Sequence, residues 1–165
     1  MKKLLVILCF LTAGFFSPME SQAQNYQTAI GARAGFGLAA TGKHFISESN
    51  ALEAIVNFRT FGVPGFRWSW VSITGLYEVH NDLSSVTDGL QWYFGGGANI
   101  TLYSGNFDLG GLNSTGIGIV GTIGLDYKFP TAPINISLDW LPGVAFTGGA
   151  GFSASAGGVA VRYAF

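Results

Sequence analysis

The sequence predicts an all-β protein: an eight-stranded antiparallel up-and-down transmembrane β-barrel that follows a cleaved signal peptide. Three observations lead to this prediction. Apolar residues recur at every second position through most of the chain after residue 23, which is the period of a β-strand. Only 10% of the 165 residues are charged, and 25 are glycine. Beyond residue 23, no segment offers the ~20 apolar residues that a membrane-spanning helix needs.

The first 23 residues have the composition of a secretory signal peptide. Two lysines precede an apolar run over 4–16, and small residues flank a cleavage site after Ala23. The single cysteine, Cys9, lies in this segment, so the predicted mature chain forms no disulfide. We therefore divide the sequence into a signal peptide, 1–23, and one outer-membrane β-barrel domain, 24–165.

Eight strands account for the alternation. We expect them, in chain order, at 27–36, 39–46, 51–61, 67–80, 89–103, 115–129, 133–141 and 153–165. Residues 27–46 could form one long strand or two short ones, and we divide them near Gly37 because glycine permits a sharp bend. The early strands alternate less regularly, since Trp70 and Leu76 fall on the polar face of the fourth.

The later strands alternate most clearly. In 89–103, apolar residues occupy the even positions from Leu90 to Leu102, apart from Gly96, and all of them except Ala98 are large. The segment 134–140 alternates apolar and polar residues throughout, and the terminal segment 159–165 carries apolar residues at every odd position. Such alternation predicts strands with one apolar and one polar face.

The connections fall into two groups, one at each end of the predicted barrel. The turns at 47–50 and 130–132 are short, and they share one end with the 81–88 connection. Longer glycine-rich connections lie at the other end, together with the bend near 37–38; they are 62–66, 104–114 and 142–152. Alternating short and long connections are typical of bacterial outer-membrane barrels.

The polar face decides which way the strands point. It consists mostly of Gly, Ser, Thr and Asn, which is too few charges for an aqueous exterior, so we expect the apolar face outside and the polar face in a narrow lumen. A soluble lipocalin-like barrel is the alternative. Aromatic residues cluster near strand ends, as expected at two membrane interfaces. The short-turn side carries Phe45, Tyr77, Trp92, Tyr127, Phe129, Tyr163 and Phe165, and the long-loop side carries Phe61, Trp68, Tyr103 and Trp140.

The alternation places a balanced set of charges inside the barrel. Four are basic and four are acidic: Arg33, Arg59, Lys128, Arg162, Glu53, Glu78, Asp126 and Asp139. Lys43 could add one more. Charges in a narrow lumen must be paired or solvated, and equal numbers of both signs favour ion pairs over a selectivity ring of one sign. Because eight strands leave an interior that side chains fill, a filled lumen is expected, with a narrow pore as the alternative.

No catalytic, metal or cofactor-binding residue is expected. Glu78 and His80 share one strand face and would suit a lipid-acting acyl hydrolase, but Glu78 points inward and His80 lies near the short-turn mouth. The glycines of 116–121 match a dinucleotide motif within a strand that no helix follows. Two histidines and no mature cysteine make a weak metal site. A formal net charge of −1 excludes a broad nucleic-acid face.

Two long connections carry exposed apolar residues. Phe107 and Phe146 are candidates for contact with another envelope component, because exposed apolar patches often mark partner sites. The alternative is a pair of loops that only touch lipid.

The C-terminal segment Val159-Ala160-Val161-Arg162-Tyr163-Ala164-Phe165 resembles the last strand of small eight-stranded Gram-negative outer-membrane β-barrel proteins. Several other segments, such as Thr74-Gly75-Leu76-Tyr77-Glu78-Val79-His80, are similar to the same family. Ala160 departs from the glycine usual at its position. The resemblance implies export to the outer membrane, contact with the bilayer and lipopolysaccharide, and assembly through the barrel-assembly machinery, which would read Tyr163 and Phe165. It implies no reaction, so a structural or interaction role is expected.

Overall fold

A computed structural model describes residues 26–35, 37–63, 66–105, 115–148, 151–153 and 157–165. The predicted signal peptide and Phe107 lie outside these residues. Side chains are described for the same residues except 61–63, 66–68 and 104–105. No helix in this part of the chain is long and apolar enough to cross a membrane.

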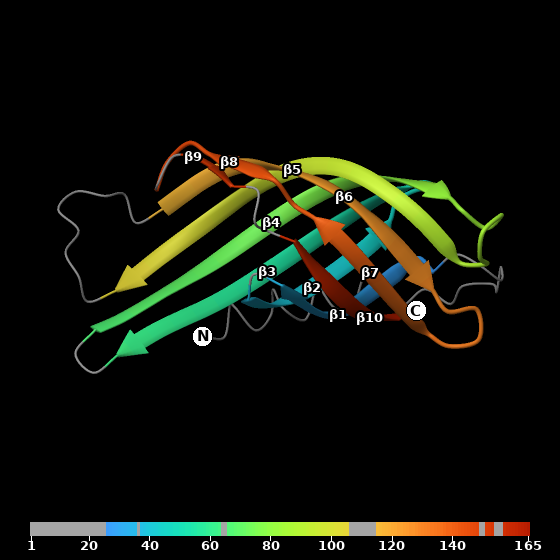
Figure 1. The fold of residues 1–165 in the computed structure, drawn as a ribbon, viewed down its shortest axis with the longest axis horizontal. Helices are drawn as coiled ribbons and strands as arrows, with labels where there is room; N and C mark the ends of the chain where they lie inside the picture. The colour runs from blue at the N-terminus through green and yellow to red at the C-terminus, as the bar shows by residue number, and fades with distance from the viewer. Residues whose placement is uncertain (1–25, 36, 64–65, 106–114, 149–150, 154–156) are drawn as a thin grey trace, which may run out of the picture.

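The described residues form ten β-strand segments. They are β1 (Thr28–Gly35), β2 (Gly37–Phe45), β3 (Asn50–Val63), β4 (Phe66–Asp82), β5 (Leu90–Gly105), β6 (Thr115–Lys128), β7 (Ile134–Trp140), β8 (Gly143–Ala145), β9 (Gly151–Ser153) and β10 (Gly157–Ala164). Strands β1 to β6 each pair antiparallel with the next, and β10 pairs with β1, which closes the sheet (Figure 1).

Two pairs of segments each form one interrupted strand, so the barrel has eight strands. Segment β7 pairs with residues 123–128 of β6, and β8 pairs with residues 118–120 of the same strand. Between them, the carbonyl of Pro142 accepts a hydrogen bond of 2.8 Å from the amide of Gly121, so the ladder continues across the break. Segments β9 and β10 form the next strand of the barrel, in which β9 pairs with β8 and β10 pairs with β7.

The predicted eight-stranded up-and-down barrel is confirmed, and so is the division near Gly37. Gly35 of β1 stands opposite Gly37 of β2, whose φ of 117° suits glycine. Two predicted connections are wrong. Strands β3 and β4 leave only 64–65 between them instead of a loop over 62–66, and 142–152 contains β8 and β9. In both places backbone pairing continues through glycine-rich sequence that shows no clear alternation.

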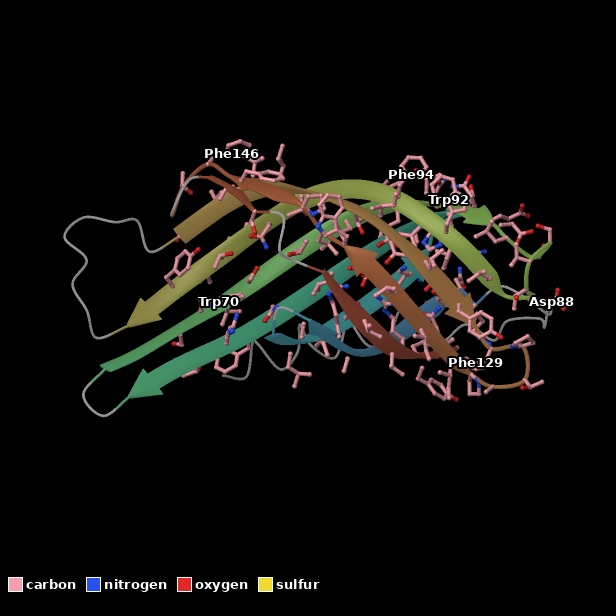
Figure 2. The ribbon with its side chains drawn as sticks, viewed as in Figure 1. Trp70, Asp88, Trp92, Phe94, Phe129 and Phe146 are labelled. Carbon is pink, nitrogen blue, oxygen red and sulfur yellow. The ribbon has the colours of Figure 1, made fainter. Side chains whose placement is uncertain are left out.

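The two faces of the wall have opposite polarity, as predicted. Large apolar side chains such as Ile123, at 49% exposure, lie on the outside. Charged side chains of the same strand lie inside, where Asp126 is 2% exposed. Trp92 and Phe94 of β5 point away from the barrel (Figure 2). Because successive residues of a strand face opposite sides, one register determines both faces.

The aromatic positions agree only in part with the two predicted bands. Exposed aromatic side chains outside the barrel include Tyr77, Trp92, Trp140, Tyr163 and Phe165. Phe45 was predicted for a band but lies inside, 9% exposed, with its ring edge-on to Tyr26. Tyr103 also faces the interior, where it lines a cavity. Both residues alternate in step with the inward-facing residues of their strands. The prediction assigned them to an outer band only because they lie near strand ends.

The barrel wall is uneven in height. Strands β1 and β2 have 8 and 9 residues, whereas β3, β4 and β5 have 14, 17 and 16. Beyond Phe58, β3 pairs with β4 alone, and the β3–β4 hairpin projects well past the β1–β2 hairpin (Figure 1). The wall is therefore low at the β1–β2 tip, opposite the tall β4 and β5.

Glycine at position 97 is required by the close approach of β4 and β5. A Cβ atom at Gly97 would lie 1.8 Å from the carbonyl oxygen of Gly75, whereas a Cβ at Gly75 would meet nothing within 4 Å. We expect Gly97→Ala to lower the free energy of unfolding by about 1–3 kcal/mol, as overpacking does. Gly75→Ala is the matched control and should change it little. Urea unfolding of both variants checks this, and equal effects would contradict it.

Candidate functional site

Lys43 of β2 is the centre of a buried cluster of charged side chains. Its Nζ atom lies 2.8 Å from Glu78 Oε2 and 3.5 Å from Glu53 Oε2. Asp126 Oδ1 lies 4.0 Å away. The ammonium also lies 4.2 Å from the ring centroid of Tyr93, a cation–π contact. One cation thus joins strands β2, β3, β4 and β6 across the lumen.

Arg162 of β10 is the second cation of this cluster. It forms an ion pair with Glu53, and its Nε atom donates to Thr41 Oγ1 at 3.2 Å. Its Nη1 atom donates to Asn135 Oδ1 at 3.0 Å and to Ser137 Oγ at 2.8 Å. Because the guanidinium presents five donors in a fixed plane, it holds side chains from three other strands at once.

Neutral side chains complete the coordination of Asp126. The hydroxyl of Tyr26 donates to Asp126 Oδ2 at 2.8 Å, and the amide of Asn135 donates to Asp126 Oδ1 at 2.8 Å. Buried carboxylates are stabilised when such donors satisfy their remaining lone pairs.

His80 closes the cluster toward the short-turn end. Its Nε2 atom lies 3.1 Å from Glu78 Oε2, and its Nδ1 atom lies 3.1 Å from Gln91 Oε1. The ring stacks on Tyr93 with centroids 4.8 Å apart, and Phe45 packs against it at 4.8 Å. Both ring nitrogens and both sides of the imidazole therefore have partners.

Arg33 and Asp139 form a separate ion pair farther along the lumen. The hydroxyl of Tyr93 donates to Asp139 Oδ2 at 3.1 Å. Since Tyr93 also contacts Lys43 and His80, its side chain connects this pair with the larger cluster.

An apolar layer separates the Lys43 cluster from a cavity. Ala39, Ile55, Leu76 and Leu141 pack together, and Val120 packs against them. Each of the first three lies two residues along its strand from a polar member of the cluster, so they form the next inward layer.

The cavity beyond this layer has a volume of about 600 Å³ and is partly open. Its lining comes from every strand of the barrel, and glycines make up a large share of it. Arg33, Trp70, Ser72, Asn99 and Tyr103 are among the polar and aromatic side chains that line it. The lumen thus has a filled half and a hollow half.

The structure brings together most of the charges that the sequence placed inside. Glu53, Glu78, Asp126 and Arg162 meet around Lys43, and Arg33 meets Asp139. Lys43, which the sequence offered only as an addition, is the centre.

Two of the predicted inward charges lie away from the Lys43 cluster. The ammonium of Lys128 donates to the backbone carbonyls of Phe129 at 2.8 Å and Ala132 at 2.9 Å, at the β6–β7 turn. Arg59 is half-buried on β3, opposite Trp70 of β4 and beyond the apolar layer. Position along the strand, which alternation alone does not encode, places both cations away from the carboxylates around Lys43.

Sequence reasoning missed the neutral members of the cluster. Tyr26 and Asn135 donate to Asp126, and Tyr93 contacts Lys43 with its ring and donates to Asp139 with its hydroxyl. Tyr93 and Asn135 lie at inward-facing positions of their strands. A tyrosine or asparagine on the inward face of a charged lumen was the available signal.

Glu78 and His80 contact each other, and their other contacts inside the barrel include Lys43, Gln91 and aromatic rings. The hydrolase alternative needs a nucleophile beside His80, and it stays a prediction. Among the residues that the structure describes, no group of three or more His, Cys, Asp or Glu side chains could hold a metal ion.

Fold and lumen together define a closed antiparallel β-barrel with an ion-paired interior and an apolar exterior. No protein-family model matches the chain, and no characterised protein matches its sequence.

The Arg33–Asp139 pair offers a clean test of the interior. Arg33→Met leaves Asp139 buried without its cation, and we expect it to lower the free energy of unfolding by about 3–5 kcal/mol. Adding Asp139→Leu should restore most of that loss, because a buried pair replaced by apolar residues is often neutral. Urea unfolding of the two single variants and the double variant measures the coupling. Additive effects would contradict a direct pair.

Proposed function

We propose that the protein is an integral outer-membrane β-barrel with a structural or interaction role in the cell envelope. The observation that carries the proposal is the inverted polarity of the wall. Ile119, Ile123 and Leu138 are 54%, 49% and 56% exposed on the outside, while Glu78 and Arg162 are 0% and 1% exposed inside. A lipid exterior suits this arrangement, since lipid-facing positions of such barrels are apolar and lumen positions polar.

Backbone pairing also favours this proposal. Strands β1, β2 and β10 have 8, 9 and 8 residues. These lengths are close to the about 9–11 residues that a tilted membrane-spanning strand needs. Closure of the sheet satisfies the backbone groups in that region, which a bilayer requires. In water, this wall would expose a contiguous apolar surface. Its area would far exceed the roughly few hundred Å² of the apolar patches on soluble monomers.

A charge on the outer wall distinguishes lipid from water as its surroundings. Ile123→Lys should lower the free energy of unfolding by about 2–4 kcal/mol and reduce the amount recovered in membranes, since a lysine in the bilayer is costly. Val86→Lys is the control, because Val86 is 71% exposed in the 83–89 turn. Fractionation and urea unfolding check both variants. A fully tolerated Ile123→Lys would indicate a water-facing wall.

The filled half of the lumen supports a non-conducting barrel. The Lys43 cluster and the apolar layer cross the interior one behind the other. We expect the purified protein to produce no stable ion-selective conductance in planar bilayers, because ions would have to cross this packed region. Stable channels with a defined conductance would favour the narrow-pore alternative.

The partners follow from the same proposal. Tyr163 and Phe165, at the end of the last strand, are 58% and 46% exposed. Assembly factors can therefore contact both side chains. Phe146 is 57% exposed next to the β8–β9 hairpin and points away from the barrel (Figure 2). It is the described candidate for contact with lipopolysaccharide or an envelope protein.

A further inference from the structure

We propose that the cavity beyond the apolar layer is a binding site for an uncharged amphipathic molecule with one hydrocarbon chain, such as a monoacylglycerol. The volume of about 600 Å³ lies in the range of small-molecule sites. This inference goes beyond a structural role, and it rests on the lining of the cavity.

One wall of the cavity is polar and its hydrogen bonds are arranged in a ladder on β4 and β5. The amide of Asn99 donates to Ser72 Oγ at 2.6 Å and to Thr74 Oγ1 at 2.8 Å. The hydroxyl of Thr101 donates to Asn99 Oδ1 at 3.0 Å. Both amide hydrogens and the amide oxygen of Asn99 are therefore used within the wall.

The ladder leaves donors for a ligand. Ser72 and Thr74 act as acceptors toward Asn99, so each hydroxyl hydrogen can point elsewhere. Both side chains line the cavity. An ester carbonyl or ether oxygen, which only accepts hydrogen bonds, complements these two hydroxyl donors.

The floor and the far end of the cavity are apolar and aromatic. Ile55, Val120 and Leu141 form the floor. Trp70 and Tyr103 stand opposite each other on β4 and β5 and both line the cavity. Such surfaces gain from contact with a hydrocarbon chain.

The charge of the lining favours an uncharged ligand. Among the described lining residues, Arg33 is the charged side chain, and it is already paired with Asp139. An anionic ligand would have to compete with Asp139 for that guanidinium, and a cationic ligand finds no carboxylate in the described lining.

The low side of the wall provides an entrance. Gly35 and Gly37, next to the tip of the β1–β2 hairpin, and Gly157, at the start of the neighbouring β10, line the cavity. These rim positions carry no side chain, while β3 continues beyond them without β2 as a partner. Among the described residues the wall is lowest on this side, so we place the entrance for the hydrocarbon chain here.

Trp70 provides the readout for a binding experiment. A background with Trp68, Trp92 and Trp140 changed to Phe leaves Trp70 as the single tryptophan, and the protein is placed in nanodiscs. The probe is a dibrominated stearoyl glycerol, whose bromines quench tryptophan on contact. We expect saturable quenching, and a second background that keeps Trp92 alone reports non-specific partition into the bilayer.

Matched variants assign the quenching to the cavity. Thr101→Phe fills the cavity and should abolish the saturable quenching, whereas Ile100→Phe, on the outer face, should retain it. Thr74→Val removes one donor without added bulk and should weaken binding by about tenfold, the loss of one hydrogen bond to a ligand. Circular dichroism checks that the variants fold. If Thr101→Phe does not fold, the Thr74→Val variant still tests the proposal.

Three results would overturn the proposal. They are quenching of Trp70 that never saturates, unchanged affinity in both cavity variants, and equal affinity for dibromostearate at a pH where its carboxylate is charged. The last result would assign the site to the chain alone, without selection of an uncharged head.

Discussion

The Lys43 ammonium among three carboxylates is the interaction on which the rest of the interior depends. A charge at 0% side-chain exposure must have partners, and Glu53, Glu78 and Asp126 come from three different strands. With Lys43 itself on β2, Arg162 adds a fifth strand through Glu53. Each carboxylate can meet the cation only in one register, because a shift by one residue would turn its side chain outward. The cluster therefore specifies the register in which the strands of the wall pair. The apolar exterior of the wall contributes little to this specificity.

Glycine makes the same lumen possible from the wall side. Gly97 of β5 lets the β4 carbonyl at Gly75 approach to a distance that any side chain would obstruct. Figure 1 shows that β5 is a strongly curved strand. An eight-stranded barrel has little interior space, so wall positions without side chains leave room for Tyr93 and Lys43 in one half and for a cavity in the other.

Sequence alternation was enough to predict the barrel, its strand order and the inward face of Glu53, Asp126 and Arg162, because a period of two directly encodes which side a residue faces. It could not predict which inward charges meet. That depends on the stagger of strands around the barrel, which places Lys128 at a turn and Lys43 at the centre. Alternation also could not predict that the strand is interrupted at Pro142. The ladder continues there through a backbone hydrogen bond from the amide of Gly121 to the carbonyl of Pro142, which no side-chain pattern encodes.

The filled and hollow halves of the lumen depend on each other. The charged side chains around Lys43 fill their half only if few waters compete for their hydrogen bonds. The layer of Ala39, Ile55 and Leu141 separates this cluster from the open cavity. In turn, a cavity rich in glycine gains little stability from its own lining. The cross-strand ion pairs supply the rigidity that holds this half open, so weakening the Arg33–Asp139 pair should loosen the cavity before it unfolds the barrel.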